Sequence, residues 1–238
     1  MRKSAVLLIL GLLLFILFFT LSAAAKKADK INAGVSVNNK TGAISSAELL
    51  SEKINLVWQH DTLPAVDLST LPKVPGVNVV SPCWYVISNE YGKINSKAVE
   101  EYVARAHTKG YKVWPLITNG FDPERTKKLL RDENARRYVI QQLLAEAEMH
   151  GFDGINLDFE NIYQEDKDEL TKFVKQIRKA TKKKNLKLSI DVTVPNGSPN
   201  WSLCFDRKKL AKQVDYVVLM AYDQYSGGSP MVSPTILG

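Results

Sequence analysis

The sequence predicts an α/β protein with a parallel sheet, because apolar segments rich in Val, Ile, Leu and aromatic residues alternate with amphipathic helical segments. Segments dominated by such residues have the profile of parallel strands that are covered on both faces. The predicted strands are residues 54–58, 77–87, 111–118, 154–160, 186–194 and 215–222. The predicted helices are 96–110, with a cap at Ser96, 134–151, with Gly151 as its end, and 166–180.

Polar residues at the carboxyl ends of the strands favour a barrel over an open doubly wound sheet. No strand is followed by a GxGxxG or GxxxxGK phosphate loop, whereas Asn119, Glu160, Asp191 and Asp223 all lie at predicted strand ends. We therefore expect a TIM-type (β/α)8 barrel with its site at that rim. Only about six βα units can be counted, so residues 51–238 are predicted to be a catalytic domain that is incomplete at its C-terminus.

The N-terminal segment predicts export. Arg2 and Lys3 precede a long apolar run that ends in small residues at Ala23, Ala24 and Ala25, the pattern of a signal peptide. The run is long enough that residues 5–25 are alternatively a membrane anchor. Residues 26–50 are polar and aperiodic and are predicted to be a linker. The expected location is extracytoplasmic: secreted, cell-wall associated, or membrane-anchored if residues 1–25 are retained.

Charge and cysteine usage exclude several other classes. The net charge of +7 is modest and lies largely in solvated helix faces such as residues 182–184, so no nucleic-acid partner is predicted. The three histidines, His60, His107 and His150, do not have metal-ligand spacing, and we predict no metal or cofactor. Cys83 and Cys204 are compatible either with a disulfide or with two thiols. We expect a monomer.

The segment DGINLDFE, residues 153–160, carries polar side chains where a buried strand should be apolar. Successive side chains of a strand point to opposite sides, so Asn156, Asp158 and Glu160 share one face and the apolar residues between them share the other. The Cα atoms of Asp158 and Glu160 would be roughly 6–7 Å apart, and carboxylates held so close in a dehydrated interior resist ionising together. Because the strand has no Lys or Arg to neutralise them, a shared proton and general acid catalysis are favoured over a structural ion-pair network.

These residues resemble a known family. DGINLDFE is similar to the fourth-strand signature of family 18 glycoside hydrolases, the chitinase-like barrel enzymes, and MAYD at residues 220–223 resembles the family's other landmark, about sixty residues further on. The resemblance covers roughly residues 52–230 and is strongest to the bacterial cell-wall and spore-cortex lytic branch. It implies hydrolysis of glycans that contain N-acetylglucosamine.

The resemblance also implies roles for individual residues. Glu160 would protonate the glycosidic oxygen, Asp158 would hold the acetamido group that attacks the anomeric carbon, and Tyr222 would hydrogen-bond the acetamido oxygen. The predicted substrate-binding residues are Asp153, Asn156, Asp223, Trp84, Asn119 and Trp201, with Trp58 and Trp114 as weaker candidates for stacking on sugars.

Departures from the family pattern leave two functions open. Asn156 replaces the signature's middle Asp, and residues 117–120 replace a Ser-x-Gly-Gly motif. The first expected function is an exported glycosidase that acts on peptidoglycan or a chitin-like glycan. The alternative is a non-catalytic carbohydrate-binding or remnant protein, because the barrel is predicted to be truncated.

Overall fold

The computed structural model describes residues 53–60, 68, 70–99 and 101–222. The chain divides into two units, residues 1–50 and 51–238, and every described residue belongs to the second. The predicted export segment and linker therefore lie outside the described residues, as does Asp223.

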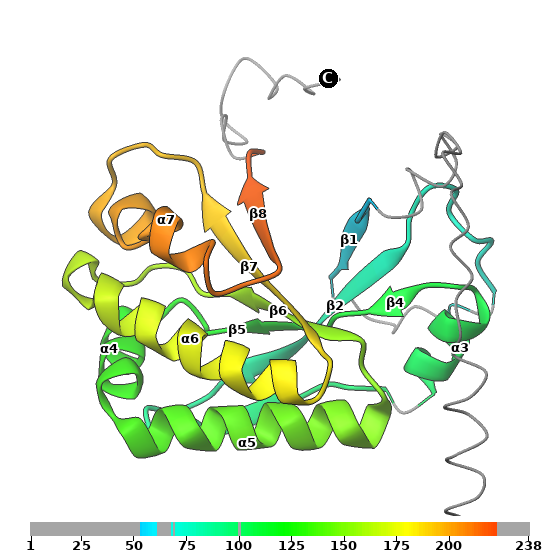
Figure 1. The fold of residues 1–238 in the computed structure, drawn as a ribbon, viewed down its shortest axis with the longest axis horizontal. Helices are drawn as coiled ribbons and strands as arrows, with labels where there is room; N and C mark the ends of the chain where they lie inside the picture. The colour runs from blue at the N-terminus through cyan, green and yellow to red at the C-terminus, as the bar shows by residue number, and fades with distance from the viewer. Residues whose placement is uncertain (1–52, 61–67, 69, 100, 223–238) are drawn as a thin grey trace, which may run out of the picture. The chain divides into compact units, whose positions relative to one another are not determined.

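A curled sheet of parallel strands forms the centre of the second unit (Figure 1). Its strand order is β1-β2-β5-β6-β7-β8, so strands that follow each other in this series lie side by side, as in part of a (β/α) barrel. These six strands are β1 (Leu56–Gln59), β2 (Val79–Ile87), β5 (Leu116–Thr118), β6 (Gly154–Asp158), β7 (Lys187–Thr193) and β8 (Tyr216–Met220). Two short strands also pair with β2: β3 (Ile94–Ser96), antiparallel, and β4 (Lys112–Val113), parallel. The predicted fold class is confirmed as a partial barrel.

Helices follow the strands and cover the outer face of the sheet. They are α3 (Tyr102–Thr108), α4 (Pro123–Arg131), α5 (Glu133–His150), α6 (Lys167–Lys183) and the short α7 (Arg207–Leu210). Figure 1 shows α5 and α6 running along the same side of β5, β6 and β7. The sequence delimits α5 clearly, because the Asp132 side chain accepts hydrogen bonds from the first-turn amides and Gly151 ends the helix with a φ of 71°.

Two local predictions were wrong, and one helix was not predicted at all. Ser96 is the last residue of β3 rather than a helix cap, and α3 begins only at Tyr102. The predicted strand 111–118 is split into β4 and β5, with Pro115, which has no N–H to donate to a ladder, between them. Helix α4 was not predicted, although Asp122, whose side chain accepts from the Arg125 amide, followed by a proline is a recognisable helix start.

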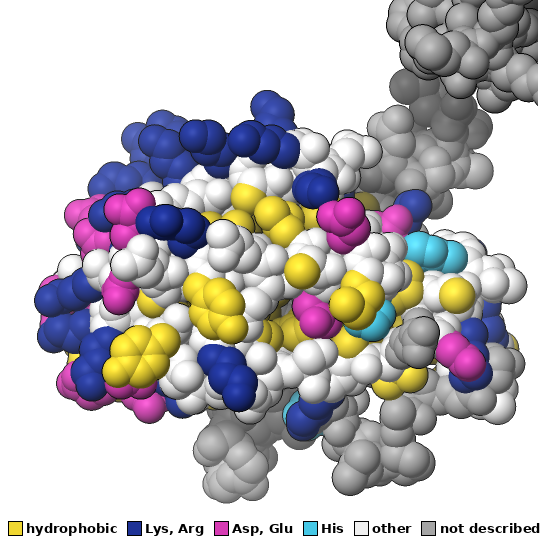
Figure 2. Space-filling model, turned by 90° about the horizontal axis from the view of Figure 1, so that it is seen from below, with side chains coloured by type: hydrophobic (Ala, Val, Ile, Leu, Met, Phe, Trp, Pro, Cys, Tyr) yellow, Lys and Arg dark blue, Asp and Glu magenta, His cyan; other side chains and the backbone are white. Residues whose placement is uncertain are grey.

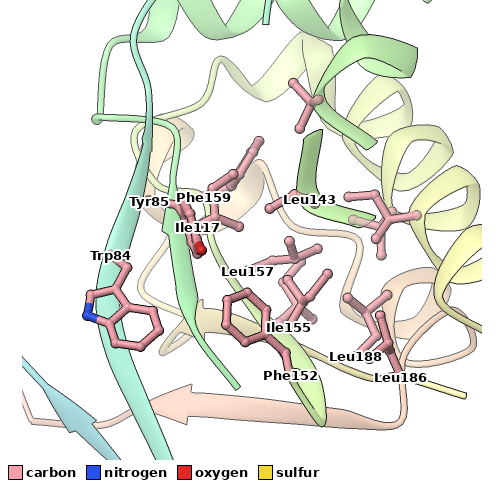
Figure 3. Packing of buried hydrophobic residues seen from close by; sticks show 14 of the residues in the cluster. Trp84, Tyr85, Ile117, Leu143, Phe152, Ile155, Leu157, Phe159, Leu186 and Leu188 are labelled. Atoms are coloured by element: carbon pink, nitrogen blue, oxygen red, sulfur yellow. The ribbon is translucent and has the colours of Figure 1, made fainter. Parts of the chain in front are cut away.

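The core lies between the sheet and these helices (Figure 3). Ile155, Leu157 and Phe159 are at most 2% exposed and point into it with Ile117 from β5 and Leu188 from β7. The predicted division of residues 153–160 into an apolar and a polar face is therefore observed. Burying each such side chain contributes about 1.5–3 kcal/mol to folding stability, so the packing of its apolar face against the helices fixes the position of β6.

The surface bears the charge that composition predicted. Lys and Arg side chains gather along one edge of the face shown in Figure 2, and α6 presents exposed lysines at Lys172, Lys175, Lys179, Lys182 and Lys183. In the described ranges, no helix has the length and apolar character needed to cross a membrane. Cys83 and Cys204 are not joined by a disulfide.

Candidate active site

A pocket of about 450 Å³ opens at the carboxyl ends of the strands. Asp158 and Glu160 from β6 and its extension, together with Asp191 from β7, form its acidic wall. Much of the remaining lining is aromatic or apolar and includes Trp58, Trp84, Tyr85, Phe121, Met220 and Tyr222. A concave site with a few convergent polar groups on an apolar lining is typical of a ligand-binding cleft.

Asn156 lies beneath the acids, fully buried, and joins its own strand, β6, to three others. Its Oδ1 accepts hydrogen bonds from the Trp58 indole N–H at 3.0 Å and from the Ser81 hydroxyl at 3.2 Å. Its Nδ2 donates to Oδ1 of Asp191 at 2.7 Å. Asn156 therefore organises the floor of the site from within the sheet and is not among the residues that line the pocket.

Asn119 holds the backbone of Glu160. Its Nδ2 donates to the Glu160 carbonyl at 2.7 Å, and its Oδ1 accepts from the Glu160 amide at 3.1 Å. The same Nδ2 also donates to the hydroxyl of Thr126 on α4 at 2.9 Å. Because Asn119 is 2% exposed, these contacts fix the predicted proton donor in place rather than presenting an amide to a ligand.

The electrostatics of the acidic wall favour protonated carboxyls. Burial raises the pKa of Asp158 to about 6, against a smaller opposing effect of its hydrogen bond with Glu160. Burial also raises the pKa of Asp191 well above its usual value, and the nearby charges of Asp158 and Glu160 act in the same direction. Asp158 and Glu160 are thus near enough to influence each other's ionisation, and a pair of carboxyl groups in this setting can hold one proton between them.

Tyr222 and Phe121 line the pocket, whereas Trp201 contacts Phe121 from outside the lining. The ring of Tyr222 is half-exposed and lies edge-on to Trp58, with 6.0 Å between the ring centroids. Trp201 is 40% exposed and lies 6.3 Å from Phe121, a pocket residue with a φ of 54°. A left-handed backbone is unusual for a bulky residue, and here the Phe121 amide donates to Oδ1 of Asn119 while its carbonyl accepts from Nδ2 of Asn161.

Two predicted site residues lie elsewhere. Asp153, at the amino end of β6, accepts hydrogen bonds from Nε2 of His107 at 2.7 Å, from Nζ of Lys112 at 2.9 Å and from the Val113 amide at 2.9 Å. The structure therefore places Asp153 at the opposite end of the strand from the pocket, in a structural ion-pair cluster. Trp114, a weaker candidate, is 2% exposed and packs against Tyr216.

Trp84 is both a pocket residue and a core residue. It borders the pocket, yet it is 6% exposed and its ring packs against Tyr102, Tyr85 and Phe152 in the core.

Among the described residues, no cluster of three or more His, Cys, Asp or Glu side chains is arranged to hold a metal ion.

Sequence reasoning placed Asp191 at a strand end but gave it no role in the site. The signal that would have found it is the barrel prediction, since successive strands of such a barrel lie side by side and this places β7 beside β6. Ser81 was missed for the same kind of reason, because its contact with Asn156 joins β2 to β6. These are contacts between strands, and the pattern within one strand does not reveal them.

A parallel barrel-type sheet with neighbouring carboxyl groups at the carboxyl ends of its strands is suited to the acid–base chemistry of a glycoside hydrolase. The sequence model for Glycosyl hydrolases family 18 matches residues 77–235, well over half of the chain, and the protein belongs to that family.

Relatives of the chain include proteins of Bacillus subtilis. One is a glycosylase named YvbX, 28% identical over 56% of this chain and 42% of its own length. Another is a cortical fragment-lytic enzyme, 31% identical over 50% of this chain and 30% of its own length. The spore cortex-lytic enzyme SleL of Bacillus cereus has a similar fold, with a TM-score of 0.64 and 22% identity over 75% of this chain and 44% of that one. The chain thus spans less than half the length of these relatives.

Proposed function

We propose that this protein is a glycosidase that cleaves glycans containing N-acetylglucosamine, with Glu160 as the proton donor. The observation that carries the proposal is the placement of two neighbouring carboxyl groups, Asp158 and Glu160, in the wall of one pocket, where burial raises the pKa of Asp158 and a proton can be kept for a general acid. The neighbouring Asp191 and the apolar lining keep this proton in a partly dehydrated environment.

The reaction would use the substrate's own acetamido group as nucleophile. Glu160 gives its proton to the glycosidic oxygen as the bond to the anomeric carbon breaks, and the acetamido oxygen bonds to that carbon. Asp158, as the anion, accepts a hydrogen bond from the acetamido N–H and balances the positive charge that develops on the group. Glu160 then removes a proton from the water that opens the cyclic intermediate.

Tyr222 lies where it can complete the site. It borders the same pocket as the two carboxyls, and its half-exposed side chain is accessible to a sugar. A phenolic hydroxyl directed at the acetamido oxygen would favour the geometry in which that oxygen faces the anomeric carbon.

Two finer aspects of the proposal concern substrate and location. The cortex-lytic relatives favour a peptidoglycan-type glycan over chitin. The apolar segment near the N-terminus supports export, because a cell-wall glycan lies outside the cytoplasmic membrane. Residues 5–25 would tether the enzyme to that membrane if they are retained.

The test is hydrolysis by the wild type and by Glu160→Gln, with peptidoglycan fragments and chitin oligosaccharides as parallel substrates. Loss of general acid catalysis predicts a fall in turnover of at least ~10²-fold. Glu148→Gln is the matched control, because Glu148 is an exposed residue of α5 that pairs with Lys184 far from the acidic wall. Equal hydrolysis by Glu160→Gln and wild type would refute the assignment, and glycan binding without hydrolysis by the wild type would identify a carbohydrate-binding protein instead.

A further inference from the structure

Asp191 occupies a position beside Asp158 that the reaction outlined above does not use. The parallel pairing of β6 with β7 matches Asn156 to Ser189 and Leu157 to Ile190, and one further step along both strands brings Asp158 opposite Asp191. Paired positions on neighbouring strands are about 4.8 Å apart, so the two carboxyl groups are lateral neighbours. Asp191 is only 1% exposed and borders the same pocket.

Each of these carboxyl groups has one oxygen without a hydrogen-bond partner among the described residues. The two atoms are Oδ1 of Asp158 and Oδ2 of Asp191, both buried. Ionised carboxylates only accept hydrogen bonds, so two anions side by side would leave both oxygens unsatisfied and would repel each other. A single proton on Asp191 satisfies both atoms, since an O–H at Oδ2 can donate to Asp158 directly or through one water.

The hydrogen bonds of Asn156 decide which oxygen of Asp191 carries this proton. Trp58 and Ser81 both donate to the same side-chain atom of Asn156, which must therefore be the amide oxygen. The amide nitrogen is then directed at Oδ1 of Asp191 and donates to it at 2.7 Å. With Oδ1 acting as an acceptor, the proton belongs on Oδ2.

We propose that Asp191 is a protonated positioning residue, whose Oδ2 hydroxyl donates to Asp158 and keeps that carboxylate ionised and oriented for its part in the reaction. The inference rests on the proposed function and deepens it. Position 156 on β6 is an amide and has no carboxyl proton to give, and Asp191 on β7 provides that acid instead. The proton stays on Asp191 throughout, and no net transfer is involved.

The surroundings of Asp191 support a neutral state. Asp158 and Glu160 face it from the β6 side, and both carry potential negative charge. On the other side, β8 pairs Val218 with Asp191 and offers no charge. Burial is the largest influence and raises the pKa of Asp191, and the two acids act in the same direction. Hydrogen bonds from Asn156 and Trp58 act in the opposite direction, but the pKa remains well above its usual value. The remaining titratable side chains of the pocket are His60, Cys83, Tyr85, Lys97 and Tyr222.

The experiment compares the pH dependence of kcat/KM in the wild type, Asp191→Asn and Asp191→Ala. Asn is close in shape, and its amide can donate to Asp158 as the hydroxyl does, so we expect the acid limb of its profile to stay within about 0.3 pH unit of the wild type. Ala removes the donor, so the Asp158 anion loses a hydrogen bond and the limb should move to higher pH by about one unit. Thermal unfolding of each variant shows whether it is folded.

A second measurement does not depend on activity. Carbon-13 NMR of the aspartate carboxyl groups in the unliganded protein should show Asp191 still protonated at a pH where Asp158 has ionised. If the wild type hydrolyses no glycan but this titration order holds, the proposed function fails and the proton on Asp191 stands. If the acid limb of the kcat/KM profile moves to lower pH in both variants, Asp191 is an anion; if that limb is unchanged in Asp191→Ala, its role is purely structural. Either result overturns the proposal. An NMR titration in which Asp191 ionises before Asp158 overturns it as well.

Discussion

Replacing Asp158 by Asn should stabilise the protein near neutral pH while it impairs the reaction. The side chain is largely buried in the wall of the pocket, and burial raises its pKa to about 6. The unfolded chain has an ordinary Asp pKa of about 3.9. The folded protein therefore binds this proton more tightly than the unfolded chain, and folding must overcome the cost of ionising Asp158 once the pH is high.

The size of the effect follows from the pKa difference. The proton on Asp158 contributes its full stability below about pH 4, and this contribution is lost as the pH rises through about 6. A difference of about two pKa units corresponds to about 3 kcal/mol at pH 7 and above, at 1.36 kcal/mol per unit. Asn is neutral at every pH and avoids this loss. We therefore expect Asp158→Asn to gain up to about 3 kcal/mol over the wild type at pH 7.5, or roughly 6–12 °C in Tm.

The assay is urea unfolding of both proteins at pH 4 and pH 7.5, with hydrolysis measured at the higher pH. The expected result is nearly equal stability at pH 4, a more stable variant at pH 7.5, and turnover reduced by about 10²-fold or more. Asp168→Asn is the control, because Asp168 is 74% exposed and makes only a surface ion pair with Lys209. A stability difference that is the same at both pH values would refute the reasoning, because it would show that ionisation of Asp158 is not its cause.

Three further outcomes are expected from other parts of the structure. Asp153→Asn should lower the free energy of unfolding by about 1–2 kcal/mol above pH 4 without changing kcat or KM, and a raised KM would contradict this account. Burial raises the pKa of Asp153, but its hydrogen bonds outweigh burial and lower it, so the stability lost in the variant, measured by urea unfolding, should shrink as the pH falls below 4. Gly154→Ala should destabilise by about 1–3 kcal/mol in the same assay, since the new Cβ would lie 2.7 Å from Cδ1 of Trp114, and an unchanged midpoint would count against that clash. Trp201→Ala should raise KM for a polymeric glycan with little change in Tm, whereas Trp84→Ala should cost about 3–5 kcal/mol of stability; the reverse pattern would exchange their roles as rim and core residues.

Much of the fold could be predicted because it depends on local patterns. The apolar face of β6 was predicted correctly because the two-residue period of a strand assigns Ile155, Leu157 and Phe159 to one side without knowledge of the partners. The same period shows why Asp153 was misplaced. Asp153 is an even number of residues from Ile155, Leu157 and Phe159, so it belongs to the same side of the strand as they do. It also lies at the amino end of the strand, away from the polar residues at the carboxyl end.

The rest of the site depends on contacts between distant segments. The link from Trp58 through Asn156 to Asp191 spans β1, β6 and β7, and its existence follows from strand register rather than from any one segment. Asn119 was predicted to meet the sugar because it ends a strand, but its amide is directed at the backbone of Glu160. Residue type and strand position identified the region, while the direction of each side chain required the packed structure.

The amide of Asn119 has a consequence for how such a site can diversify. Loops at the carboxyl ends of barrel strands are where substrate range usually changes, because they accept insertions without disturbing the sheet. The turn after β5 is an exception here, since it carries Asn119, whose side chain hydrogen-bonds to the amide and the carbonyl of Glu160 and also to Thr126 of α4. Lengthening that turn would displace the acid itself. New specificity in proteins built this way should therefore arise in the segment after β7, where Trp201 lies exposed, and the turn after β5 should keep its length.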